Sequence, residues 1–144
     1  VNQLIICSVL SMELCACGTG NEYMDCCAKY ISMNAYPLTA EQLMRSRYVA
    51  YVKCEISYII QTTDTSTRSL YNVKSIGEWA STSHWQKLEI ISTSEGLEKD
   101  TKGYVEFKAY YLDAKNKQNI HHEYSTFKKV KDVWYFVEGK VYTV

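Results

Sequence analysis

Four cysteines lie close together in the stretch 15–27, and this cluster constrains the fold more than any other feature of the chain. Cys15 and Cys17 are separated by one residue, whereas Cys26 and Cys27 are adjacent. Zinc accepts four thiolates in a tetrahedral arrangement, and two such pairs converge on one ion if a turn lies between them. Two glycines between the pairs supply the backbone freedom for that turn. The spacing therefore predicts one structural zinc ion.

Disulfide bonds and reduced core thiols are the alternatives to a metal site. Adjacent cysteines such as Cys26 and Cys27 bond to each other only with strain, because a relaxed disulfide needs a larger separation of its Cα atoms. The chain also has no credible secretory signal, which favours a reducing compartment. We therefore expect metal-binding thiolates in the cluster. Cys54, which lies outside the cluster, is predicted to be a small buried apolar residue.

The cysteine cluster resembles a known zinc-binding segment. Cys-x-Cys-Gly-x-Gly, an aromatic residue and Cys-Cys follow one another in 15–27, which is similar to the SEC-C motif found in the C-terminal tail of the SecA translocation ATPase and in many small bacterial proteins. Ala16 stands where proline is usual and Thr19 where serine is common, but neither position is a ligand. The ligands implied by the resemblance are Cys15, Cys17, Cys26 and Cys27.

The composition limits the number of domains and the classes of partner. A chain of 144 residues accommodates one domain with a small attached element. Sixteen basic and sixteen acidic residues cancel, so no overall field attracts nucleic acid or an anionic membrane surface. Thirteen tyrosines and one proline are typical of well-ordered strands. We expect a cytoplasmic protein that has no membrane partner and does not bind nucleic acid.

The first residues raise the question of an export or membrane segment. The stretch 1–11 is apolar, but a spanning helix needs about 20 apolar residues and a signal peptide begins with positive charge. We therefore predict that Met12 is the natural start and that 1–11 are not native, and we assign 1–12 to a leader segment. The rest of the chain is predicted to divide into a zinc knuckle, 13–30, and a cone-shaped domain, 31–144.

Hydrophobic periodicity changes from helical to strand-like along the chain. Thr39 followed by Gln42 fits a capping box, and apolar residues recur at helical spacing after it. Val105, Phe107 and Ala109 alternate with polar residues, as in a half-buried strand. Helices are predicted over 39–52, 56–62 and 70–79, and strands over 85–92, 104–112, 120–130 and 133–137 with a continuation at 141–144. Three helices followed by an antiparallel sheet predict an α+β domain.

Four stretches of the chain resemble the YchJ family of bacterial SEC-C proteins, in the family's order: 43–51, 103–111, 122–127 and 134–139. The match extends over nearly all of the chain after the leader. It implies a cone-shaped domain of the nuclear transport factor two-like (cystatin-like) type, in which three helices cover a curved, mainly antiparallel sheet and leave a pocket at the open end. Because this fold hosts enzymes and binding modules alike, it does not select a function.

Several residues of the domain are candidates for lining such a pocket. On the returning strand, His122 is either a hydrogen-bonded core histidine or, as its family position favours, a pocket residue. His121 and Glu123 share the other face, where they either bind a polar ligand or contact water, as charged side chains on a sheet face usually do. Arg45 and Arg47 lie in the family's helix motif, and each either pairs with a carboxylate on the sheet or holds a ligand anion. The candidate lining residues are Arg45, Arg47, Tyr48, Trp85, Tyr110, His122 and Glu123.

The sequence leaves two classes of function open. In the first, which we rank higher, the protein is a non-catalytic adaptor whose zinc knuckle contacts a protein partner, by analogy with the translocase tail, whose zinc segment contacts a chaperone and the ribosome. The alternative is a small-ligand carrier or an enzyme that uses the cone pocket. The sequence has no Ser-His-Asp order, phosphate loop or catalytic metal signature, which favours the first class. A deep cavity where arginine, histidine and carboxylate converge would favour the alternative.

Overall fold

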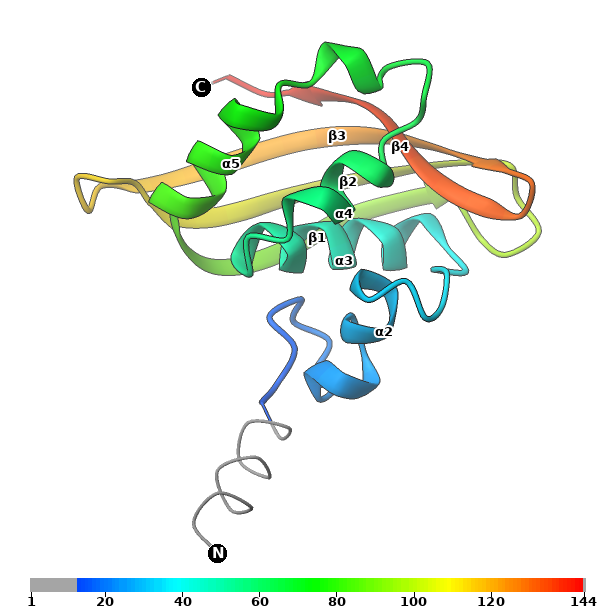
Figure 1. Ribbon diagram of the computed structural model, residues 1–144, viewed down its shortest axis with the longest axis horizontal. Coiled ribbons are helices and arrows are strands. Elements are labelled where there is room, and N and C mark those ends of the chain that lie inside the picture. The colour runs from blue at the N-terminus through cyan, green and yellow to red at the C-terminus, as the bar shows by residue number, and fades with distance from the viewer. Residues whose placement is uncertain (1–12, 144) are drawn as a thin grey trace, which may run out of the picture.

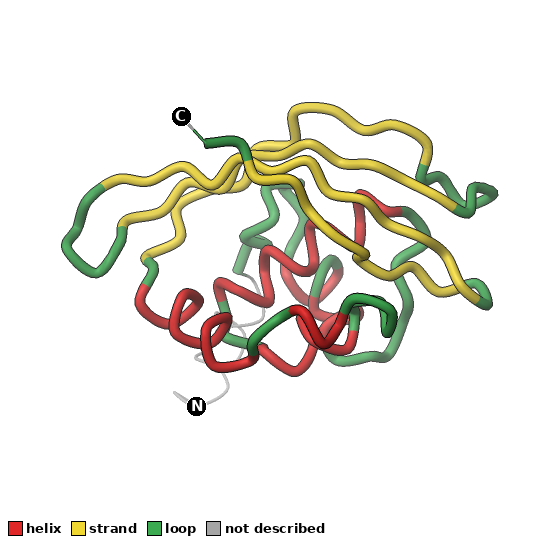
Figure 2. The backbone as a smooth tube through the Cα atoms, turned by 90° about the horizontal axis from the view of Figure 1, so that it is seen from above, coloured by secondary structure: helices red, strands yellow, loops and turns green. Residues whose placement is uncertain are grey.

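The fold consists of one curved antiparallel sheet covered on one face by helices (Figure 1, Figure 2). The computed structural model describes residues 13–143, so the expected leader, 1–12, lies outside the described residues. The elements in chain order are η1 (Tyr23–Asp25), α2 (Ala28–Ile31), α3 (Ala40–Val52), α4 (Ile56–Gln61), η2 (Arg68–Leu70), α5 (Val73–Thr82), β1 (His84–Glu95), β2 (Lys102–Leu112), β3 (Gln118–Val130) and β4 (Val133–Val141). This order confirms the predicted α+β class.

The four strands pair in the order of the chain, and every pair is antiparallel. Side chains of β2 alternate as the sequence predicts, because Val105, Phe107 and Ala109 are buried on the face that meets the helices. Register shifts interrupt the pairing of β1 with β2 and of β3 with β4. Such bulges increase the local twist and bend of a sheet. The sheet accordingly curves toward the helices, as Figure 2 shows.

Helix α3 is the central helix, and it contacts β1, β2 and β4. It begins where the sequence predicts, because Thr39 Oγ1 accepts a hydrogen bond from the Gln42 N–H at 3.1 Å. The Gln42 side chain accepts from the Leu38 N–H at 2.9 Å, one residue before the partner that a capping box predicts. Leu43 and Val49 of this helix are fully buried. Helix α3 therefore forms the middle of the core and leaves its remaining faces for other elements.

The segment after α3 turns sharply before α4. Cys54 lies in this turn with a φ of 56° and is exposed, so the prediction that it is buried is wrong. Helix α4 ends beside β4, where the Phe136 N–H donates to Thr62 O at 2.8 Å and the Asp64 N–H donates to Phe136 O at 2.7 Å. These two hydrogen bonds fix the end of α4 against the sheet.

Helix α5 begins later than the sequence predicts. Asn72 is its N-terminal cap and accepts a hydrogen bond from the Ser75 N–H at 2.9 Å, whereas Leu70 belongs to the preceding turn, η2. The hydroxyl and amide side chains that favour caps thus decide the boundary. Within residues 13–143, no helix has both the length and the apolar character needed to cross a membrane.

Candidate functional site

The four cysteines of the knuckle come together in space. Their Sγ atoms all lie within 4.8 Å of one another, with 3.6 Å between Cys17 and Cys26 and 3.9 Å between Cys26 and Cys27. Four thiolates at about 2.3 Å from a tetrahedral zinc ion are about 3.8 Å apart, so the observed spacing fits a metal ion. The same separations are too long for a disulfide bond, and the four thiols are free. The cluster is therefore a candidate metal site.

A tight backbone turn positions the cysteines. The Cys15 N–H donates to Asn21 O at 2.8 Å and closes the loop between the two pairs. Gly18 and Gly20 have φ values of 86° and 87°, which lie in the left-handed region that favours glycine. The two glycines thus supply the turn that the sequence predicts.

Hydrogen bonds between the thiols shift their pKa values in opposite directions. A hydrogen bond with Cys15 lowers the pKa of Cys17. The hydrogen bond with Cys17 raises the pKa of Cys15 to about 11, and a hydrogen bond with Cys15 raises the pKa of Cys27. Thr19 Oγ1 lies 3.4 Å from the Sγ atoms of both Cys17 and Cys26. A divalent cation would replace the thiol protons, because metal binding to cysteine requires the thiolate form.

The knuckle packs directly on helix α3. Arg45 Nη1 donates to Cys17 O at 2.6 Å, and its Nε donates to Glu41 Oε2 at 2.8 Å. Lys53 Nζ donates to Glu13 Oε1 at 2.9 Å. Because Cys17 is 0% exposed and belongs to the hydrophobic core of the whole domain, the knuckle is an integral part of the fold.

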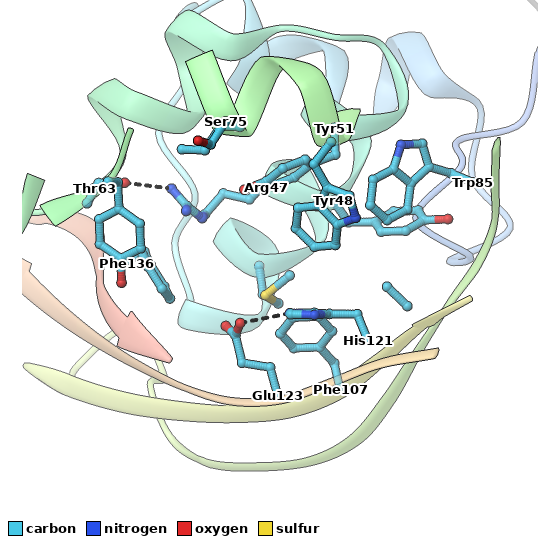
Figure 3. A pocket seen from close by; sticks show the side chains of 15 residues that line it. Arg47, Tyr48, Tyr51, Thr63, Ser75, Trp85, Phe107, His121, Glu123 and Phe136 are labelled. Atoms are coloured by element: carbon cyan, nitrogen blue, oxygen red, sulfur yellow. Dashed lines mark hydrogen bonds and ion pairs between the residues drawn. The ribbon is translucent and has the colours of Figure 1, made fainter. Parts of the chain in front are cut away.

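A cavity of about 260 Å³ lies between helix α3, helix α5 and the sheet (Figure 3). Its wall is mainly aromatic, with edge-to-face contacts such as the one between Trp79 and Trp85, whose ring centroids are 5.2 Å apart. The aromatic lining residues are Tyr48, Tyr51, Tyr71, Trp79, Trp85, Phe107 and Phe136. Arg47, His121 and Glu123 are the charged or titratable groups that are set among these rings.

Arg47 carries a buried positive charge at the cavity wall and is only 6% exposed. Its Nη1 donates to Ile59 O at 2.8 Å, to Thr62 Oγ1 at 2.7 Å and to Thr63 Oγ1 at 3.3 Å, all at the end of α4. The guanidinium lies 4.4 Å from the centre of the Phe136 ring. Burial lowers the pKa of Arg47, but a guanidinium stays charged in proteins because its unperturbed pKa is so high.

A histidine and a carboxylate on β3 form a pair at the wall opposite Arg47 (Figure 3). His121 Nε2 lies 2.9 Å from Glu123 Oε1, and the Ser125 hydroxyl donates to the other Glu123 oxygen. Burial raises the pKa of Glu123, but the hydrogen bonds from His121 and Ser125 outweigh it and hold that pKa below its ordinary value of 4.5. Gly139 on β4 lies against the Glu123 side chain, where a Cβ atom would collide with it. Glu123 is therefore an ionised and tightly held group.

Tyrosine hydroxyls complete the polar part of the cavity. Burial raises the pKa of Tyr48 to about 12. Burial also raises the pKa of Tyr51, although the charge of Arg47 counteracts it, and raises the pKa of Tyr71. Phenols with raised pKa values stay protonated near neutral pH and are hydrogen-bond donors. Among residues 13–143, no side chain or backbone group accepts from the hydroxyls of Tyr51, Tyr71 or Ser75, all of which line the cavity.

The predicted lining residues divide into two groups. The cavity contains Arg47, Tyr48, Trp85 and Glu123 but not Arg45, Tyr110 or His122. Arg45 turns to the knuckle instead. Tyr110 donates to Glu89 at 2.9 Å, and His122 pairs with Glu106 at 2.8 Å, both on the outer face of the sheet. Assigning these three residues to the pocket is therefore wrong, because their positions on α3, β2 and β3 direct them away from it.

His121 is one of the polar lining residues that are not among the sequence-based candidates. Counting back from the buried Phe127 in steps of two gives Ser125, Glu123 and His121 on the inner face of β3. That signal was present in the sequence. It was obscured because Ile120 on the outer face is apolar, although it is 52% exposed. The aromatic lining from α5 and β4 has no such local signal, because only the fold brings it to the cavity.

The chain is similar to a known protein family over most of its length. The sequence matches the family described as YchJ, middle NTF2-like domain, over residues 39–139. A UPF0225 protein from Geobacter sulfurreducens is 46% identical over 127 residues, which are 88% of this chain and 78% of the relative. A UPF0225 protein from Haemophilus influenzae is 46% identical over 136 residues, which are 94% of this chain and 83% of the relative.

Two solved structures of SEC-C motif containing proteins are also similar. The solution structure of one from Rhodopseudomonas palustris has a TM-score of 0.81 at 36% identity and covers 90% of this chain and 98% of its own. The crystal structure of one from Psychrobacter arcticus has a TM-score of 0.77 at 33% identity and covers 94% of this chain and 86% of its own. With a SEC-C cysteine cluster preceding an NTF2-like domain, the chain belongs to the YchJ family.

Proposed function

We propose that this protein binds a small organic molecule in the cavity beside helix α3, in the bacterial cytoplasm, while its knuckle holds one structural zinc ion. The observation that carries the ligand-binding role is the cavity itself, which has about 260 Å³ of space and an aromatic wall in which polar groups such as Arg47, His121 and Glu123 are set. Ligand sites in proteins are typically concave and mostly apolar, with a few well-placed polar groups.

The cavity has physical costs that a purely structural domain would avoid. Its volume equals that of about nine water molecules at about 30 Å³ each. Protein interiors are otherwise close-packed, and unfilled space lowers stability. Charged groups such as Arg47 and Glu123 add a desolvation cost beside apolar walls. These costs favour a binding role over the adaptor role that the sequence alone ranks first.

Zinc in the knuckle is proposed as a structural ion. Four thiolates fill all four positions of a tetrahedral site and leave none for a reacting molecule. The ion would hold Cys17 in place, and Cys17 is tied through Arg45 to the helix that carries Arg47 and Tyr48 into the cavity. Metal analysis after reducing, chelator-free purification should give one zinc per chain. Less than half an equivalent, or a different metal, would refute this assignment.

The ligand-binding role is tested with a variant that fills the cavity. Ala109 lines the cavity and is 3% exposed, so Ala109→Leu occupies part of the space. Its matched control is Lys108→Leu, which adds an apolar side chain to the outer face of the same strand. Neutral ring compounds such as phenylacetamide and benzyl alcohol should quench the tryptophan fluorescence of the wild type and of Lys108→Leu, and should bind Ala109→Leu at least about tenfold more weakly. Equal binding to all three proteins, or none, would contradict the proposal.

A protein partner at the knuckle is a second proposal. Leu14 and Met24 are 68% and 58% exposed, and exposed apolar side chains on a small element favour protein interaction. The double variant Leu14→Ser, Met24→Ser should lose a bound protein in quantitative affinity purification from the native host. Leu70→Ser is the control, since Leu70 is 78% exposed but belongs to η2. Identical protein profiles for both variants would count against this role.

A further inference from the structure

The guanidinium of Arg47 has two edges with different partners. Its Nη1 is fully used by one carbonyl and two hydroxyl oxygens at the end of α4. Its Nε and Nη2 make no hydrogen bond to any residue within 13–143. Every fully buried side-chain nitrogen and oxygen among the described residues does have a partner. The unused N–H groups of Arg47 therefore face the cavity rather than the packed core.

The charge of Arg47 also has no acid in contact with it. No Asp or Glu of residues 13–143 lies within 4.0 Å of this guanidinium. Glu123 is the acid that shares the cavity, but its two oxygens are already engaged by His121 and Ser125. A buried charge without a direct counterion is destabilising unless another charge is supplied. An anionic ligand would supply it.

Further hydrogen-bond donors line the same cavity as Arg47. The hydroxyls of Tyr51 and Tyr71 line the same cavity, and both phenols are close enough to Arg47 to feel its charge. Ser75, which is exposed on α5, adds a third hydroxyl, and Figure 3 shows it beside Arg47. None of these hydroxyls has an acceptor among the described residues. One guanidinium edge and three hydroxyls thus form a donor-rich end of the cavity.

The rest of the cavity suits a flat apolar body. Trp79 and Trp85 stand edge to face at 5.2 Å between ring centroids, and Tyr51 lies 5.2 Å from Trp79 in the same manner. Trp85 is fixed by a hydrogen bond from its Nε1 to Ala80 O at 3.2 Å. Fixed aromatic rings offer large contact area to another ring at little cost in conformational entropy. The volume admits one ring with a short substituent.

We propose that the cavity binds a small organic acid with one flat ring, as its carboxylate. The carboxylate accepts hydrogen bonds from the free edge of Arg47 and from the hydroxyls of Tyr51 and Tyr71, and the ring lies against Trp79 and Trp85. An arginine edge and a carboxylate match in shape and form charge-assisted hydrogen bonds, which are stronger than neutral ones. A cationic ligand is disfavoured, because it would meet Arg47 while the Glu123 oxygens are already engaged. The inference depends on the proposed ligand-binding role and specifies its ligand class.

The test uses three probes that share a phenyl ring and differ in charge. Phenylacetate is the anion, phenylacetamide the neutral analogue and phenethylamine the cation. Dissociation constants are measured by calorimetry and tryptophan fluorescence at constant ionic strength. We expect phenylacetate to bind at least about tenfold more tightly than phenylacetamide, which corresponds to one or two hydrogen bonds to a charged group. Phenethylamine should bind more weakly than both.

Variants on helix α3 assign the preference to one residue. Arg47→Met should reduce the ratio of the two dissociation constants to about one while phenylacetamide still binds. Arg45→Met is the matched control, because Arg45 lies two residues away and contacts the knuckle instead; it should keep the full preference. Since Arg47→Met also removes hydrogen bonds from the end of α4, the double variant Tyr51→Phe, Tyr71→Phe gives an independent test. This double variant should raise the dissociation constant of phenylacetate by roughly threefold to tenfold and leave that of phenylacetamide unchanged.

The outcomes separate this inference from the proposed function. If phenylacetamide binds as tightly as phenylacetate, the carboxylate class is wrong although the cavity still binds ligands. If phenethylamine binds most tightly, Glu123 dominates and the inference is overturned. If the preference for the acid persists in Arg47→Met and in the double variant, the donor-rich end is not where the carboxylate lies. If no probe binds the wild type, the ligand-binding role itself fails.

Discussion

The knuckle and the cavity are built from residues that are distributed in opposite ways along the chain. All four thiols of the knuckle lie within 15–27, and a local turn brings them together. The cavity draws its lining from α3, α5 and all four strands, with Thr63 and Tyr71 from the segment between α4 and α5. A short stretch of sequence therefore specifies the first region, whereas the whole fold specifies the second.

Arg45 and Arg47 show this difference on a single helix. The two residues are separated by one position on α3, yet Arg45 binds the backbone of the knuckle and Arg47 lies at the cavity. A helix turns by about 100° per residue, so two residues that are two apart face different directions. Helix α3 is therefore shared by both regions, while each region uses its own side of it. Mutations on either side measure how far the two regions are independent.

Loss of a knuckle thiol should have the largest effect. Cys17→Ser removes one ligand of the proposed zinc site at a position that is 0% exposed. We expect it to lower the unfolding free energy by more than about 3 kcal/mol, because structural zinc supplies roughly 10–16 kcal/mol of binding free energy. Thermal denaturation with excess zinc and reductant measures this change, and the midpoint should fall by roughly 10 °C. Cys54→Ser, at the exposed turn, is the control. Equal midpoints for both variants would show that the knuckle thiols do not stabilise the core.

A backbone change beneath the cavity should have an intermediate effect. A Cβ atom at Gly139 would collide with the Glu123 side chain. Gly139→Ala should therefore displace Glu123 from His121 and cost about 1–3 kcal/mol of unfolding free energy, measured by urea denaturation. The control is Gly77→Ala in α5, where a Cβ meets nothing within 4 Å. That variant should be stabilised by about 0.5–1 kcal/mol, because alanine favours a helix. If Gly139→Ala leaves the free energy of unfolding unchanged, the position of Glu123 is not rigid.

Acid should destabilise the cavity wall through Glu123. Its pKa lies below the ordinary value of 4.5 in the folded protein, so its contribution to stability is present above that value and is lost as the pH falls through the lower, folded pKa. Unfolding free energies measured between pH 7 and pH 3 should fall less steeply for Glu123→Gln than for the wild type. Ser125→Ala, which removes one donor to this carboxylate, should give an intermediate slope. Three parallel curves would show that Glu123 is not stabilised by its partners.

Loss of a contact between the knuckle and helix α3 should have the smallest effect on ligand binding at the cavity. Arg45→Met removes the hydrogen bond to Cys17 O, which is worth about 1 kcal/mol of unfolding free energy. Because Arg45 does not line the cavity, the dissociation constant of phenylacetate should change by less than about twofold. Calorimetry on Arg45→Met and on the wild type gives both constants. A change of about fivefold or more would mean that helix α3 couples the two regions energetically.

The order of the elements follows from local patterns that can be read in the sequence. The Thr39 cap, the alternation of Val105, Phe107 and Ala109, and the glycine turn of the knuckle are each produced by residues within a few positions of one another. The face of β3 was harder to predict, because Ile120 is apolar on the outer side and the inner side carries His121 and Glu123. Buried faces are usually apolar, so a buried face that carries polar residues is not recognised from its pattern.

The sequence by itself determined the cysteine cluster and the class of fold, because spacing and periodicity are properties of neighbouring residues. The family was indicated separately, by the resemblance of four stretches to known relatives. Only the tertiary structure decided which arginine faces the cavity, that His121 rather than His122 lies at its wall, and that a space of about 260 Å³ is left between α3, α5 and the sheet. These features depend on the direction of side chains from elements far apart in the chain. The register of the strands and the packing of the helices fix those directions, and no local pattern contains that information.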